Sequence, residues 1–203
     1  MWKLSDMRTH VGSHILLMLR SSSENDQGLE VMGSNPCGWC GRDSSVGGCW
    51  TWLVLDPKGI KQPRTESNCD YHYGGMRYSA AAAFSTSSPC TNVPLHCQIC
   101  AKILWGEQRT FWKYNAMYHM LLEHSSEEAG QEISLPEVPL EFILSMFTSR
   151  KEETALGVDE HATKDYQETY GLPMSDDLEN LEYLACKRAL SCGTDSEHVN
   201  KHR

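Results

Sequence analysis

The sequence has few aromatic residues and no long hydrophobic run. Aromatic residues occupy 9% of its 203 positions, and four of them are phenylalanine. The apolar stretch 15–19 is short, whereas a transmembrane helix needs about 20 residues. Mean hydropathy is −0.47. We therefore expect neither a membrane span nor one large hydrophobic core, but small modules that need stabilisation beyond the burial of apolar side chains.

Signatures of secretion and of catalysis are also missing. No basic segment leads into an apolar stretch with a cleavage site, so we expect a reducing compartment, the nucleus or the cytosol. There is no glycine-rich phosphate loop, and no His-x-Glu precedes Cys97, as a zinc-dependent nucleobase deaminase would require. The well-placed cysteines fit metal ligands better than nucleophiles. We therefore predict that the protein is not an enzyme and has no small-molecule substrate.

Positive charge is scarce, and the charges are unevenly placed. The formal net charge is −9; residues 1–124 carry 11 Lys+Arg and 10 Asp+Glu, while residues 125–203 carry 7 and 17. A dedicated DNA-binding domain has a basic face, and an acidic tail repels phosphate. The composition leaves a nucleic-acid partner and a protein partner about equally open, and it gives no sign of a membrane partner.

What the sequence does contain is cysteine and histidine at metal-ligand spacing. It has nine cysteines, and an odd count with two C-x2-C pairs favours metal over disulfides. Cys97 and Cys100 form a knuckle that directs both sulfurs to one point, and His119 and His124 follow about a helical turn apart. Four protein ligands leave no position for a water molecule. We predict a C2H2-type finger over residues 89–124 with one structural zinc ion.

A second zinc module is predicted over residues 36–88. A C-x2-C pair is followed by a strand over residues 49–55, a hairpin turn, and a helix over residues 73–84, which is the order of a treble-clef-like module. Its predicted ligands for a second structural Zn²⁺ are Cys37, Cys40, Cys69 and His72. Cys49 could replace one of these ligands and Cys90 could replace His72. Each of these two cysteines is otherwise a buried small hydrophobe.

The N-terminal segment repeats part of the finger. Trp112-Lys-Tyr-Asn-Ala-Met precedes His119, and Trp2-Lys-Leu-Ser-Asp-Met precedes His10 and His14, as in an internal repeat. Apolar residues recur at helical spacing over residues 4–20. We predict that residues 1–20 are an orphan finger helix that docks on another module. Without a cysteine pair upstream, we do not expect His10 and His14 to hold metal.

The remaining boundaries follow from changes of composition. Residues 21–35 are polar and are predicted to be a linker. The finger helix is predicted to begin near Thr110, after an enlarged turn at residues 104–109. Residues 125–203 are predicted to be an acidic tail with helices over 138–155, 159–170 and 175–190 and a disordered end. The predicted fold is therefore small α+β zinc modules, ββα-like and treble-clef-like, followed by an α-helical, partly disordered acidic tail.

These motifs resemble a known family. The run Pro89-Cys-Thr-Asn-Val-Pro-Leu-His-Cys97-Gln-Ile-Cys100, the segment Trp112 to Met117 with its two histidines, and the opening Ser5-Asp-Met-Arg-Thr-His-Val-Gly12 are similar to the multi-finger C2H2-type proteins encoded in many copies in mushroom-forming fungi. The resemblance covers residues 1–157. It implies zinc binding and says little of a biological role, and it implies an N-terminally truncated first finger without its cysteine half.

Two functions fit this pattern. In the first, a nuclear zinc-finger protein binds nucleic acid in a transcription-related role, and its predicted phosphate contacts are Arg8, Arg77, Lys102, Arg109 and Lys113. In the second, a zinc-stapled module binds another protein, and its predicted anchors are Trp39, Trp50, Trp52, Trp105 and Trp112. A clustered basic face would favour the first function, and exposed tryptophans would favour the second.

Overall fold

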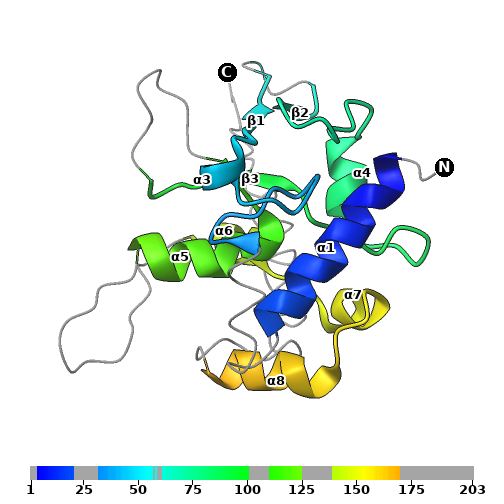
Figure 1. The fold of residues 1–203 in the computed structure, drawn as a ribbon, viewed down its shortest axis with the longest axis vertical. Coiled ribbons are helices and arrows are strands. Elements are labelled where there is room, and N and C mark those ends of the chain that lie inside the picture. Colours follow the sequence, from blue (N-terminus) through cyan, green and yellow to red (C-terminus); the bar gives the residue numbers. More distant parts are fainter. Residues whose placement is uncertain are drawn as a thin grey trace, which may run out of the picture.

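Short helices and two small sheets make up the fold (Figure 1). The computed structural model describes residues 4–20, 32–56, 58, 61–100, 110–124 and 139–169. The helical elements are α1 (Leu4–Arg20), α3 (Ser44–Gly47), α4 (Tyr78–Ala82), the 3-10 turn η1 (Lys113–Asn115), α5 (Ala116–His124), α6 (Leu140–Met146), α7 (Arg150–Ala155) and α8 (Glu160–Thr169). The strands are β1 (Thr51–Val54), β2 (Arg64–Ser67), β3 (Pro94–His96) and β4 (Thr110–Trp112). This mixture confirms the predicted α+β class.

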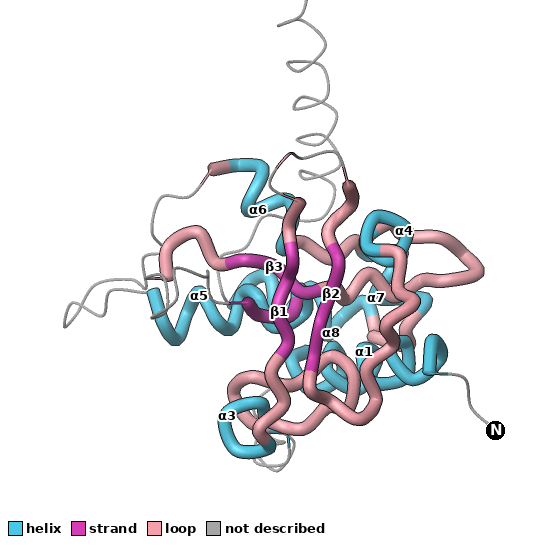
Figure 2. Tube along the Cα trace, turned by 90° about the horizontal axis from the view of Figure 1, so that it is seen from above, coloured by secondary structure: helices cyan, strands magenta, loops and turns pink. Residues whose placement is uncertain are grey.

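Each sheet is one antiparallel pair of strands. Thr51 of β1 lies opposite Ser67 of β2, and Pro94 of β3 lies opposite Trp112 of β4. Figure 2 shows β1 and β2 side by side, with β3 passing close to β1. The first pair confirms the predicted strand and hairpin. Because a two-stranded sheet is at best marginally stable in water, both pairs need support from side-chain packing or from metal ligands.

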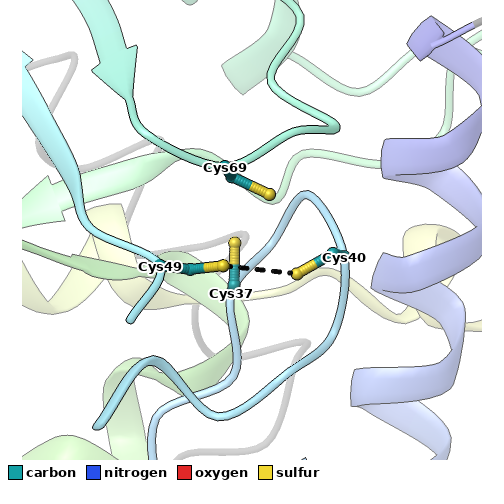
Figure 3. Close-up of side chains that lie close together, drawn as sticks. All are labelled: Cys37, Cys40, Cys49 and Cys69. Atoms are coloured by element: carbon teal, nitrogen blue, oxygen red, sulfur yellow. Dashed lines mark hydrogen bonds between the residues drawn. The ribbon is translucent and has the colours of Figure 1, made fainter. Parts of the chain in front are cut away.

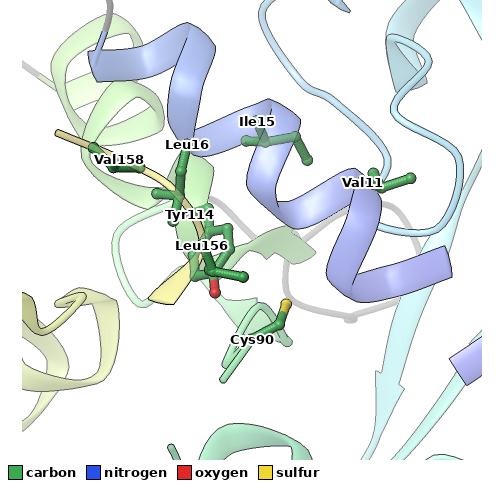
Figure 4. Packing of buried hydrophobic residues seen from close by; sticks show 7 residues of the cluster. All are labelled: Val11, Ile15, Leu16, Cys90, Tyr114, Leu156 and Val158. Carbon is green, nitrogen blue, oxygen red and sulfur yellow. The ribbon is translucent and has the colours of Figure 1, made fainter. Parts of the chain in front are cut away.

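Helix α1 packs on later parts of the chain, as predicted for the N-terminal segment. Its buried residues Val11, Ile15 and Leu16 recur at helical spacing and form one face. They meet side chains from three distant segments, shown in Figure 4: Cys90, Tyr114, Leu156 and Val158. Gly12 lets the helix approach closely, because a β-carbon there would lie 2.8 Å from Cys90 Sγ. The helix is therefore part of the main core of the described chain.

The other two cores also combine residues from more than one predicted segment. The first surrounds Phe111 and includes Cys97, Ala116, Met120, Phe142 and Met146. The second contains Cys37, Trp39, Cys69 and Trp112. The rings of Trp39 and Trp112 meet edge to face, with centroids 5.1 Å apart. The two cysteine-containing regions therefore pack on each other through Trp112, which the sequence pattern places only in the finger.

Two consecutive carboxylates are buried where α7 meets the core. Glu152 and Glu153 are each 2% exposed. Glu152 accepts hydrogen bonds from the Thr91 backbone N–H at 2.6 Å and from the Tyr114 hydroxyl, and burial raises the pKa of Tyr114, which keeps the phenol a donor. Glu153 accepts from Arg20 at 2.6 Å. Since a buried carboxylate is costly unless it is paired, these contacts fix α7 against α1 and η1.

The observed helices differ from the predicted ones in three places. The predicted helix over 138–155 is two helices, α6 and α7, because the chain is extended at Phe147 and Ser149 caps α7. The finger helix begins at Ala116 and not near Thr110, since Thr110, Phe111 and Trp112 pair with β3, and β-branched and aromatic residues suit a strand. The helix predicted over 73–84 is reduced to α4.

One further predicted helix is confirmed, and several predictions concern residues that the structure does not describe. Helix α8 confirms the helix predicted over 159–170. The enlarged turn at 104–109, the helix over 175–190 and the disordered end lie outside the described residues, as does most of the linker over 21–35. Among the helices that the structure describes, none is both long enough and apolar enough to cross a bilayer.

The close contact at Gly12 gives a test of the main core. We predict that Gly12→Val lowers the free energy of unfolding by about 2 kcal/mol, because the added methyl groups overpack the space that Cys90 and Tyr114 fill. His14→Val, at an exposed position of the same helix, is the control for a valine in α1 that makes no buried contact; at Gly12 the higher helix propensity of valine over glycine would by itself stabilise the helix. Urea denaturation measures both variants. Equal losses in the two would contradict the packing of α1 described above.

Candidate metal centres

The open end of the β1–β2 hairpin brings Cys49 and Cys69 together. Cys49 lies two residues before Thr51 and Cys69 two residues after Ser67, and these two partners are opposite each other in the register. Side chains two residues apart point to the same face of a strand. Asn68 closes this end, because its side chain accepts from the Trp50 N–H at 2.6 Å and donates to Gly48 O at 2.7 Å.

A tight loop supplies Cys37 and Cys40. Pro36 and Asp43 form a bridge across the loop. The Cys37 N–H donates to Arg42 O at 2.8 Å, and the Gly41 N–H donates to Cys37 O at 2.7 Å. Gly41 has a φ of 76°, which a residue with a side chain rarely adopts. The loop therefore turns back on itself and directs both sulfurs toward the end of the hairpin.

The four sulfurs of Cys37, Cys40, Cys49 and Cys69 face one point (Figure 3). They all lie within 4.8 Å of one another, and Cys40 Sγ is 3.7 Å from Cys49 Sγ. A zinc–sulfur bond of about 2.3 Å in a tetrahedron places two sulfurs about 3.8 Å apart. This group, called here the four-thiol centre, therefore fits a zinc ion.

Burial favours the protonated form of three of these thiols, those of Cys37, Cys49 and Cys69, in the absence of metal. Burial and the nearby Cys40 thiol together raise the pKa of Cys69 to about 12, although the hydrogen bond from the Tyr71 backbone lowers it. Burial also raises the pKa of Cys37 and of Cys49. A metal ion binds the thiolate, so it must displace these protons.

A second group, called here the C2H2 centre, joins Cys97 and Cys100 to His119 and His124. Cys97 follows β3 directly, and both histidines lie on α5. The Cys100 N–H donates to Cys97 Sγ at 3.3 Å, which shapes the knuckle.

The distances in the C2H2 centre also fit a tetrahedron. Cys100 Sγ lies 3.5 Å from His119 Nε2 and 3.2 Å from His124 Nε2, and Cys97 Sγ lies 3.2 Å from His124 Nε2. Tetrahedral zinc with ordinary bond lengths places sulfur and nitrogen about 3.6 Å apart. The Phe111 ring stacks on His119 at 4.6 Å and fixes the orientation of that imidazole. These three sulfur–nitrogen distances therefore differ from those of a zinc site by only a few tenths of an ångström.

The structure brings together seven of the eight predicted ligands. Cys37, Cys40 and Cys69 converge with Cys49 and not with His72, so the group differs from the predicted set at one position. His72 Nε2 lies 3.2 Å from Thr65 O, and its ring packs edge to face on Trp39. The reason is the hairpin register: Thr51 lies opposite Ser67, so the residues two positions beyond them, Cys49 and Cys69, lie at the same end of the hairpin.

The remaining alternatives lie apart from both centres. Cys90 is fully buried in the α1 core, with its sulfur 3.7 Å from Arg8 O. The rings of His10 and His14 are 4.5 Å apart on the exposed side of α1, and they belong to neither group. Within the described residues, the four-thiol and C2H2 centres could each bind one zinc ion.

No family model, no curated protein and no solved structure matches this chain. The resemblance to fungal C2H2-type proteins therefore stays a prediction. The assignment of both centres depends on their donor atoms and distances.

Single substitutions distinguish Cys49 from His72 as the fourth ligand. We predict that Cys49→Ala lowers the zinc content from two ions per chain to one, because three sulfurs hold zinc much less tightly than four. His72→Ala should retain both ions. Native mass spectrometry counts the ions in each variant. Loss of an ion in His72→Ala, with two ions retained in Cys49→Ala, would contradict the assignment.

Acid should weaken the four-thiol centre steeply. The pKa values of Cys37, Cys49 and Cys69 are raised, so zinc displaces at least about three protons there near neutral pH, and its affinity should fall about a thousandfold per pH unit on acidification. Competition with a chromophoric chelator at about pH 7.5 and about pH 6.5 measures this slope. A change below about tenfold would contradict the displacement of protons from buried thiols.

Proposed function

We propose that the protein is a non-catalytic binding protein of the nucleus or cytosol that two structural zinc ions hold together. Each centre offers four protein ligands, which leaves no coordination position for water. The order β3, β4, α5 around the C2H2 centre is that of a ββα-like finger, and the knuckle, hairpin and α4 around the four-thiol centre follow a treble-clef-like order. In such small modules, metal binding supplies folding free energy.

The observation that carries the proposed recognition is the exposure of two tryptophans, Trp52 on β1 and Trp50 just before it. Trp50 is 66% exposed and Trp52 is 38% exposed, and their spacing of two residues places them on one face of the hairpin. Leu55 and Val46, 51% and 87% exposed, lie nearby in the chain. Exposed tryptophans on one face of a hairpin are typical of protein interfaces, where tryptophan often dominates the binding energy. We call Trp50 and Trp52 the tryptophan face.

Two of the three predicted phosphate contacts in the described residues, Arg8 and Lys113, make hydrogen bonds within the protein, which favours a protein partner. Arg8 is buried and donates to Asn92 O at 2.9 Å, so it does not serve as the predicted phosphate contact. Lys113 Nζ donates to Thr91 Oγ1 at 2.7 Å, and Arg77 is exposed. Glu66 lies opposite Trp52 in the register, where its charge would repel phosphate.

Two predicted anchors are core residues and one is outside the description. Trp39 and Trp112 are buried between the centres, so they are not available to a partner. Trp105 lies outside the described residues, as do Lys102 and Arg109.

Binding of nucleic acid is the second candidate. Lys58, Lys61 and Arg64 are exposed on the same hairpin as the tryptophan face. Single-stranded nucleic acid binds surfaces that combine stacking aromatics with basic groups. The hairpin therefore carries both kinds of group, and a transcription-related role can be tested by measuring oligonucleotide binding.

The double substitution Trp50→Ala with Trp52→Ala tests the proposed surface. We predict that it abolishes capture of a protein from a nuclease-treated cell extract by the immobilised full-length chain, while the free energy of unfolding falls by only about 1 kcal/mol, because Trp50 is mostly exposed and Trp52 is partly exposed. Leu122→Ala, which removes another exposed apolar side chain, should capture the same protein as the unchanged chain.

Binding of nucleic acid, the second candidate, predicts a different result. A labelled single-stranded oligonucleotide, followed by fluorescence anisotropy, should bind with a steep salt dependence, and the double substitution should remove that binding. This result, together with protein capture that does not depend on the two tryptophans, would contradict the protein-binding proposal.

A further inference from the structure

The four thiols of the four-thiol centre differ in their access to solvent. Cys37 and Cys69 are buried, whereas Cys40 and Cys49 are half-buried. The sulfurs of Cys40 and Cys49 are 3.7 Å apart and come from two separate segments, the knuckle loop and the start of the hairpin (Figure 3). A disulfide needs its sulfurs about 2 Å apart, so a shift of less than about 2 Å would join them.

We propose that Cys40 and Cys49 form a peroxide-reactive dithiol, and that its oxidation to a disulfide releases the zinc ion of the four-thiol centre. This inference rests on the zinc occupancy proposed above. It adds a modification site whose substrate is a hydroperoxide.

The reaction balances with one molecule of hydrogen peroxide. One thiolate attacks a peroxide oxygen, so that an S–O bond forms, the O–O bond breaks, and the leaving hydroxide takes a proton to become water. The second thiolate then attacks this sulfenic sulfur, the S–S bond forms, and the S–O bond breaks with loss of a second hydroxide, which is also protonated. The two sulfurs together lose two electrons to the peroxide. Zinc remains divalent and leaves because two of its four ligands are gone.

The two centres are expected to respond differently. In the C2H2 centre, Cys100 is half-buried, Cys97 is buried, and both other donors are histidines. Only one accessible sulfur is available there, so a disulfide within that centre forms less readily. The C2H2 centre therefore serves as an internal control for oxidation of the four-thiol centre.

Oxidation would also act on the tryptophan face. Trp50 directly follows Cys49, and the open end of the hairpin is held by the four-thiol centre together with Asn68. Once zinc leaves, Cys69 is no longer tied to Cys49 across this end. A peroxide would then loosen the segment that presents Trp50.

Exposure of the zinc-loaded full-length chain to hydrogen peroxide tests the proposal. Native mass spectrometry should first count two zinc ions per chain, and then show loss of one ion at least about tenfold faster than loss of the second. Peptide mapping without reductant should place the new disulfide between Cys40 and Cys49. Cys49→His, which keeps a fourth ligand but removes the second accessible thiol, should retain both ions under the same treatment.

The contradicting results are separate from failure of the zinc assignment. A chain that holds no zinc before treatment would contradict the proposed function itself. A chain that holds two ions but forms its first disulfide at another pair, or loses the zinc of the C2H2 centre first, would overturn the dithiol proposal alone. Even if Cys49→His binds a single ion, peptide mapping of the unchanged chain shows whether Cys40 and Cys49 form the first disulfide.

Discussion

The convergence of four thiols at the open end of one short hairpin is the constraint on which the rest of the molecule depends. Strands β1 and β2 have four residues each, too few to be stable as an isolated pair. A zinc ion bound by the four thiols would tie this hairpin to the knuckle loop that carries Trp39. Trp39 in turn packs on Trp112, and through it the first centre is linked to the second.

Strand β4 links the two centres because neighbouring residues point to opposite faces of a strand. Phe111 stacks on His119 in the C2H2 centre, while Trp112 belongs to the core beside the four-thiol centre. The knuckle loop packs closely on the Trp112 ring, since a β-carbon at Gly38 would lie 2.3 Å from that ring. The adjoining turn η1 supplies Tyr114 to the α1 core. One short segment therefore takes part in all three cores.

Patterns in the sequence were sufficient to predict the features that depend on residue spacing. The helical period over 4–20 predicted α1, and the spacing of Cys97, Cys100, His119 and His124 predicted a group that the structure assembles. The choice between Cys49 and His72 was not accessible in this way. It depends on which residues lie beside Cys69 at the open end of the hairpin. That is set by the register of the two strands, which the spacing of the ligands does not record.

Features that depend on distant partners were missed for a related reason. Glu152 and Glu153 resemble solvent-facing helix residues in the sequence, yet they are buried because Thr91, Tyr114 and Arg20 arrive from elsewhere in the chain. Likewise, the helix predicted from Thr110 competes with strand pairing to β3, and the pairing prevails. The spacing of residues along the chain does not show which strand will pair with a segment or which groups will pair with a carboxylate.

X-ray absorption at the zinc edge tests the central claim most directly, because it measures the donor atoms and not only the ion count. One four-thiol centre and one C2H2 centre predict an average of three sulfurs at about 2.3 Å and one nitrogen at about 2.0 Å per zinc. A first shell with more nitrogen than this would favour His72 over Cys49. A shell dominated by oxygen, or a purified folded chain without zinc, would contradict the account.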